Sequence, residues 1–253
     1  MQLIDTHAHI YMPEFADDRA AVIEKAKLAR VDLIIMPAID SKTHEAMIEL
    51  EQQYSNCKSM IGLHPCSVKG INEEELNIVD QWLGKQKFIA IGEIGLDFYW
   101  DKTFIDQQYY AFHHQISLSI SHNLPIVIHS RNAIDECIEV VGQYPGLRGV
   151  FHCFSGNLHQ AEQIIKTGFF LGIGGVVTYK NAGLDKIVEQ VGLDSLILET
   201  DAPYLAPVPF RGKRNESSYL IYIAKKIAAI TGKELDEVAL VTTQNAMKLF
   251  KLC

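Results

Sequence analysis

Short apolar runs alternate with amphipathic stretches along most of the chain. The apolar runs cover residues 3–5, 33–39, 59–63, 88–96, 125–129, 149–154, 169–175 and 196–201. Helical periodicity lies at 20–29, 44–54, 75–84 and 161–168, with two further helices expected near 216–231 and 234–250. Strands that alternate with helices predict parallel β-α-β units, and eight such units predict a (β/α)8 barrel. A doubly wound open sheet is the alternative.

Length and charge narrow the classes of protein that fit this pattern. The chain has 253 residues, which fits one barrel domain over residues 1–253. The formal charge is 23 − 31 = −8, which argues against a protein that grips long duplex DNA by a broad basic face. A small site that handles a phosphate with the help of metal ions remains open.

Cysteine spacing and the distribution of apolar residues indicate the compartment. None of the five cysteines forms a C-x-x-C pair, so neither a zinc finger nor a disulfide framework is expected. No secretory signal pattern opens the chain, and no apolar run reaches the roughly 18 residues of a membrane helix. We expect a cytoplasmic protein that uses no membrane, and the sequence implies no obligate protein partner.

Ionisable residues gather at the ends of the predicted strands. They are His7, His9, His64, Glu93, Asp97, His129, Arg131, His152, Glu199 and Asp201. The other histidines, which are His44, His113, His114, His122 and His159, fall in helical stretches and are expected to be solvated. The active site of a barrel lies at the carboxyl ends of its strands. Burying so many ionisable groups without partners would be costly, so they predict a functional site there.

The residue types point to metal ions. Several histidines with two or three carboxylates form the ligand set of a site for two divalent metals, such as Mg²⁺, Mn²⁺ or Zn²⁺. One group must bridge the ions, and no lysine stands at the end of the fourth strand to do so, since Lys85 and Lys87 precede it and Lys102 follows well after. Glu93 is therefore the natural bridge. Asp201 is expected to be a ligand and proton acceptor, and Glu199 to orient an imidazole.

The motifs DTHAH, GLHP, GEIGLDFY, HSR, HCFSG, LETDAPYLAP and RGKRNE, in this order, resemble the TatD family of metal-dependent deoxyribonucleases. The resemblance implies an amidohydrolase-like barrel with one or two divalent metals. It also implies phosphodiester hydrolysis, as a deoxyribonuclease or 3′→5′ exonuclease. By position, one metal would take His7, His9, Glu93 and Asp201, the other would take Glu93, His129 and His152, and His64 and Arg131 would face the phosphate. Ser217 departs from the family, which often has proline there, and predicts a looser substrate loop.

The expected reaction is attack of a metal-activated water on phosphorus, with Glu93, Asp201 and His64 as the catalytic residues. The expected partner is single-stranded or frayed DNA, held by His64, Arg131, Arg211, Lys213 and Arg214. The three basic residues at 211–214 alternatively form a solvated loop.

Other readings remain open. Residues 98–100 are aromatic and either stack on a base or only pack their loop. Cys153 follows His152 and is expected to point away into packing. The rival functions are an amidohydrolase or small-molecule phosphoesterase that uses the same metals, and a metal-holding binding protein without turnover.

Overall fold

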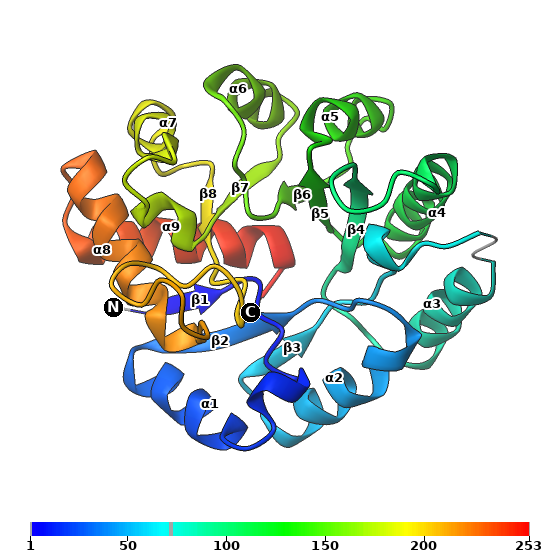
Figure 1. Ribbon diagram of the computed structural model, residues 1–253, viewed down its shortest axis with the longest axis horizontal. Helices are drawn as coiled ribbons and strands as arrows, with labels where there is room; N and C mark the ends of the chain where they lie inside the picture. Colours follow the sequence, from blue (N-terminus) through cyan, green and yellow to red (C-terminus); the bar gives the residue numbers. More distant parts are fainter. Residues whose placement is uncertain (1, 71–72, 253) are drawn as a thin grey trace.

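Parallel strands and outer helices alternate in the computed structural model, which describes residues 2–70 and 73–252 (Figure 1). The strands are β1 Leu3–Asp5, β2 Val31–Met36, β3 Cys57–Ser59, β4 Ile91–Asp97, β5 Ile126–Arg131, β6 Gly149–Phe151, β7 Phe170–Ile173 and β8 Leu196–Leu198. The helices are α1 Arg19–Leu28, α2 Ser41–Gln53, α3 Glu73–Lys85, α4 Ile105–His122, α5 Ile134–Gly142, α6 Leu158–Lys166, α7 Leu184–Val191, α8 Leu220–Thr231 and α9 Leu235–Phe250. Short 3-10 helices lie at Pro13–Phe15 (η1), Pro65–Ser67 (η2), Gly175–Thr178 (η3) and Ser217–Tyr219 (η4).

The strands close into a barrel, which confirms the (β/α)8 prediction against an open sheet. Parallel pairing joins β1, β2 and β3 in one sheet and β4 to β8 in another. Backbone bridges join the two sheets at both seams, Ile61 with Ile91 and Ala8 with Ala202. The first seam is held by the Gly92 amide, which donates to the carbonyl of Ile61 at 2.8 Å.

The core has two layers, as expected for a barrel. The larger layer lies between strands and helices and contains residues such as Ile34, Phe112 and Leu171. A second cluster joins one apolar residue from most strands with the end of α9: Ile4, Ile35, Met60, Ala90, Val127, Val150, Ile197, Ala246, Leu249 and Phe250. Helix α9 therefore closes one end of the barrel, and the other end is left for the site.

The elements differ from the predicted ranges mainly at the strand ends. Five of the predicted runs continue past the residue where pairing stops; β6, for example, ends at Phe151 rather than at 154. The polar residues of these runs consequently lie in the loops directly after the strands. The helix expected from 216 begins at Leu220, because η4 occupies the residues before it.

The length and hydrophobicity of the helices bear on whether any of them could cross a membrane. None of the helices in residues 2–70 and 73–252 is both long and apolar enough to cross a membrane.

Candidate metal centre

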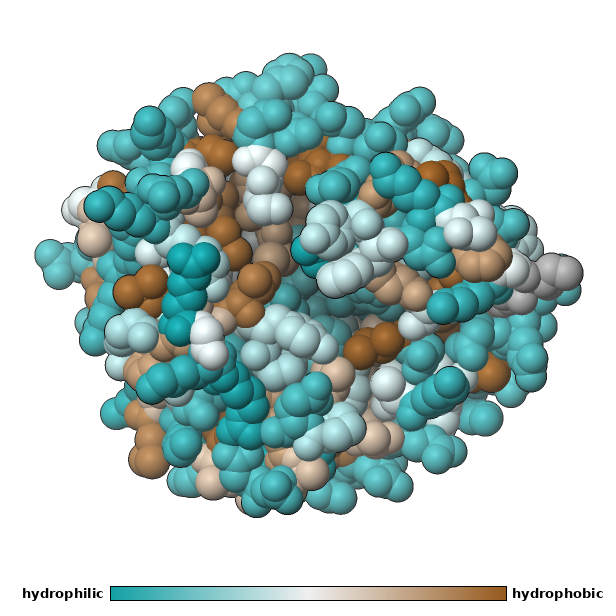
Figure 2. All heavy atoms as spheres, in the orientation of Figure 1, coloured by the Kyte–Doolittle hydropathy of each residue, from teal (hydrophilic) through white to brown (hydrophobic). Residues whose placement is uncertain are grey.

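A cavity of about 650 Å³ opens at the carboxyl ends of the strands. Its lining includes most of the ionisable residues that the sequence predicts there, among them Glu93. Figure 2 shows the hollow near the middle of this face of the molecule. The volume lies within the usual range for small-ligand sites.

Glu93 is the residue around which the predicted ligands gather. It lies on β4, is 2% exposed, and has its two oxygens turned to different groups. Oε2 lies 3.1 Å from His7 Nε2 and 3.8 Å from His9 Nε2. Oε1 lies 2.8 Å from His129 Nδ1 and 3.7 Å from His152 Nε2. One oxygen of the carboxylate thus faces His7 and His9, and the other faces His129, His64 and His152.

Asp201 lies among the same imidazoles. Its Oδ1 lies 3.8 Å from the Nε2 atoms of His7, His9 and His152 alike. His7, His9 and Asp201 form one set of donor atoms close enough to hold an ion, and His7, Glu93 and His152 form a second.

Neighbouring groups fix which imidazole nitrogens face the centre. The Tyr11 hydroxyl donates its only proton to the carbonyl of Pro37 at 2.8 Å, so at 3.1 Å it accepts from Nδ1 of His9. The lone pair of His9 therefore lies on Nε2, toward the carboxylates. Asp97 Oδ2 lies 2.8 Å from Nε2 of His129, which leaves Nδ1 of that ring for an ion. Carboxylates and hydroxyls in this position orient ligand histidines at metal sites.

Glu199 lies beside His152. Its Oε1 lies 3.0 Å from Nδ1 of His152 and accepts from the Cys153 amide. The predicted role of Glu199, which is to orient an imidazole, stays a prediction. The site requires glycine at position 172 on β7, since a Cβ there would lie 2.5 Å from Glu199 Oε2.

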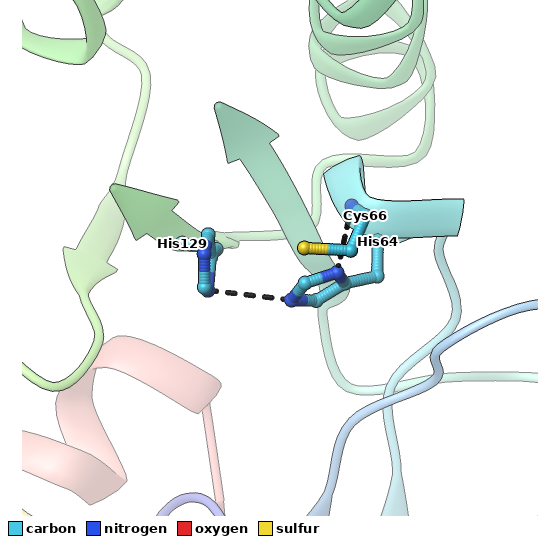
Figure 3. A group of neighbouring side chains, drawn as sticks. All are labelled: His64, Cys66 and His129. Carbon is cyan, nitrogen blue, oxygen red and sulfur yellow. Dashed lines mark hydrogen bonds between the residues drawn. The ribbon is translucent and has the colours of Figure 1, made fainter. Parts of the chain in front are cut away.

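His64 differs from the other histidines. The Cys66 amide donates to His64 Nδ1 at 3.0 Å, so the proton of the neutral ring lies on Nε2. That nitrogen points at His129 Nδ1 (3.3 Å) and at Glu93 Oε1 (3.4 Å), as Figure 3 shows for the two rings. His64 therefore presents a hydrogen-bond donor to the cavity rather than a lone pair.

Burial governs the charges in the centre. It lowers the pKa values of His7, His9 and His152, so these rings are neutral and can ligate. It raises the pKa of Asp201 to about 7. A buried carboxylate without a cation is costly, and a divalent ion among these donors would supply the missing positive charge. Imidazole and carboxylate donors suit divalent ions from Mg²⁺ and Mn²⁺ to Zn²⁺, so the residues present fit a metal centre.

The basic candidates have different surroundings. Arg131 lines the cavity and lies 4.1 Å above the Tyr99 ring. Arg211 is exposed and lies 4.6 Å above the Tyr179 ring, and Lys213 is exposed. Arg214 instead forms a double hydrogen bond with Asp18 at 2.7 and 2.8 Å. Its predicted contact with substrate stays a prediction, but an ion pair already holds its guanidinium.

Two side-chain expectations from the sequence are wrong. Cys153 lines the cavity instead of packing away from it, because its φ of 47° breaks the strand alternation after β6. His44 is fully buried on the inner side of α2, beside Met47 and Ile48, rather than solvated.

Sequence reasoning also missed two roles. Asp97 was noticed only as a strand-end carboxylate, and Tyr11 was not noticed. The signal for Asp97 was its place at the end of β4, directly beside the strand that carries His129.

Ser217, where the family often has proline, is fully buried and begins η4 beside Asp5.

The barrel and its ring of histidines and carboxylates define the class of metal-dependent hydrolases. The chain belongs to the TatD family, since the model of the TatD related DNases matches residues 4–251. It is 39% identical over 253 residues to the metal-dependent hydrolase YabD of Bacillus subtilis (strain 168), covering 99% of both chains. It is 31% identical to the 3′-5′ ssDNA/RNA exonuclease TatD of Erwinia amylovora, covering 99% of this chain and 100% of that one.

A solved structure agrees with the fold. The crystal structure of YjjV, a TatD homologue from Escherichia coli K12, superposes with a TM-score of 0.94 at 30% identity, covering 99% of this chain and 98% of that chain.

Proposed function

We propose that this metal-dependent hydrolase is a deoxyribonuclease that removes nucleotides from the 3′ end of single-stranded DNA. The observation that carries the proposal is the position of Glu93, whose two oxygens face different groups of imidazoles. A bridging carboxylate between two ions is the arrangement used for in-line displacement at phosphorus. The exonuclease name of the Erwinia relative supports the choice of substrate.

The proposed ligands follow the two sides of Glu93. His7, His9, Asp201 and Glu93 would hold one ion, and His129, His152 and Glu93 would hold the other. When bound, the divalent ions lower the pKa of water toward about 7 and neutralise charge on the phosphoryl oxygens. Mg²⁺, Mn²⁺ and Zn²⁺ all suit these donors.

The protein's own groups would direct the reaction. Asp201 lies beside the proposed ligand histidines and would accept the proton of the attacking water. His64 Nε2–H donates a hydrogen bond to a phosphoryl or leaving oxygen, since the Cys66 amide fixes its tautomer. Arg131 adds a positive charge at the same cavity. The free thiols Cys57, Cys66, Cys137 and Cys153 fit a reducing compartment such as the cytoplasm.

The experiment is a substrate panel with metal-loaded protein. A 5′-labelled single strand should shorten stepwise from its 3′ end, and blunt duplex should be cut more slowly. A small phosphodiester and a cyclic amide serve as comparison substrates. Rapid turnover of the amide with no cleavage of either DNA would contradict the proposal and make the protein an amidohydrolase.

A further inference from the structure

Two large aromatic side chains stand in solvent at the rim of the cavity. Tyr99 is 52% exposed and Trp100 is 67% exposed, directly after β4. Trp100 also lines the cavity. Grouped exposed apolar surface beside a site marks a place where a ligand binds.

The turn that carries these rings is fixed to the metal centre. Asp97 Oδ1 accepts hydrogen bonds from the amides of Tyr99 and Trp100, both at 2.9 Å. The other oxygen of the same carboxylate lies 2.8 Å from His129 Nε2. The position of the aromatic pair is thus coupled to a proposed metal ligand, and a surface ordered in advance costs less to bind.

Arg131 joins the aromatic pair from the neighbouring strand β5. Its guanidinium lies 4.1 Å from the Tyr99 ring and 5.2 Å from the Trp100 ring, so both rings help to hold it. Tyr99 and Trp100 meet edge to face at 5.0 Å and 86°. Tyr99 is covered by the guanidinium, and Trp100 is the more exposed ring.

Further apolar surface faces the cavity from the far side of the barrel. Tyr204 and Leu205 follow β8, are 47% and 39% exposed, and line the same cavity. Strands β4 and β8 are the two edges of the five-stranded sheet, so they stand across the barrel from each other (Figure 1). A flat ligand at Trp100 would thus lie over the candidate metal centre, with Trp100 on one side of the cavity and Tyr204 and Leu205 on the other.

We propose that Trp100 stacks on an unpaired base at the 3′ end of a DNA strand while Arg131 binds a phosphate next to it. The inference rests on the proposed function and adds a residue that selects single strands. Aromatic rings bind bases of any sequence by stacking. A base inside a duplex has both faces covered by its neighbours, so only a frayed or single-stranded end offers a free face.

The test compares two 5′-labelled strands that differ only at the 3′ terminus, one with a base and one abasic. Wild type should bind the abasic strand about tenfold more weakly, seen as a higher KM. Trp100→Ala should lose that preference with kcat and bound metal unchanged, and Trp100→Phe should keep most of it. Tyr110→Ala is the control, because Tyr110 is 55% exposed on α4 and does not line the cavity. An unchanged preference in Trp100→Ala would overturn the proposal.

A binding measurement separates this inference from the proposed reaction. The chain has two tryptophans, Trp82 and Trp100, so Trp82→Phe leaves Trp100 as the only indole fluorophore. The base-bearing strand should quench this fluorescence, and the abasic strand should quench it much less. Equal or absent quenching overturns the stacking role even if DNA is hydrolysed. Selective quenching without hydrolysis supports stacking and contradicts the proposed function.

Discussion

The histidines of this site differ in role because a different group contacts the ring nitrogen that faces away from the centre in each of them. His9 is held by Tyr11 and His129 by Asp97, and each turns its other ring nitrogen to the centre. His64 is held by a backbone amide and turns a proton there instead. The residue type is the same in each case. The group beside the ring determines whether the histidine serves as a metal ligand or as a hydrogen-bond donor.

The His64 assignment gives a prediction with two readouts. His64→Gln should lower kcat by about 10²–10⁴-fold, the usual contribution of a positioned proton donor, while bound metal stays at the wild-type level. Metal content by elemental analysis and single-turnover kinetics check this. Cys66→Ala keeps the amide that fixes the ring and should retain near-normal kcat. Loss of metal in His64→Gln would instead make His64 a ligand.

Most of the candidate ligands could be predicted from the sequence, because strand order places the ends of parallel strands at one rim. His7 and His9 followed from their spacing, and Glu93 from the absence of a bridging lysine. The direction of Cys153 could not be predicted, since it depends on one left-handed φ. The partner of Arg214 could not be predicted either, because Asp18 lies 196 residues away in sequence.

At the scale of elements, Asp97 at the end of β4 connects the candidate metal centre with the aromatic residues at the rim of the cavity, because it contacts both His129 and the amides of Tyr99 and Trp100. Asp97→Asn should weaken metal binding about 10–100-fold, the usual cost of losing a partner that orients a ligand histidine. Competition with a chromophoric chelator measures the affinity. Asp101→Asn is the matched control, since Asp101 Oδ1 caps the same loop at the Thr103 amide without touching a histidine. Equal affinity in the two variants would contradict the role of Asp97.

The seam between β1 and β8 gives a prediction on pH. Burial raises the pKa of Asp5 to about 7, even though Thr200 donates to it through its amide and hydroxyl. The folded state therefore holds a proton that the unfolded chain loses near pH 4, so this residue makes stability fall as pH rises from about 4 to 7.

Asp5→Asn removes this titration, so the stability of the variant should decrease less between about pH 4 and pH 7 than that of the wild type. The measurement is the free energy of unfolding in urea at several pH values for both proteins. A parallel pH dependence in wild type and variant would show that Asp5 does not titrate in this range.

The whole molecule carries a net charge of −8, so DNA bound as proposed would be repelled at long range and would need local contacts to hold it. Arg131→Ala, Arg211→Ala and Lys213→Ala should each raise KM and reduce the slope of log K against log salt by about 0.7 on single strands. Arg214→Ala should change the slope less, because Asp18 already pairs with that guanidinium. Unchanged KM and slopes in the first three variants would make these charges ordinary solvated surface.

The central claim is that metal bridged by Glu93 enables hydrolysis of DNA. The most direct measurement titrates Mn²⁺ into verified metal-free protein, counting ions bound per chain while following cleavage of a 5′-labelled single strand. The rate should be absent without metal and reach its plateau at two ions per chain, and Glu93→Gln should bind fewer ions and lose at least about 10³-fold in rate. Metal-free protein that cleaves at the plateau rate, or Glu93→Gln with full metal content and a near-normal rate, would contradict the account.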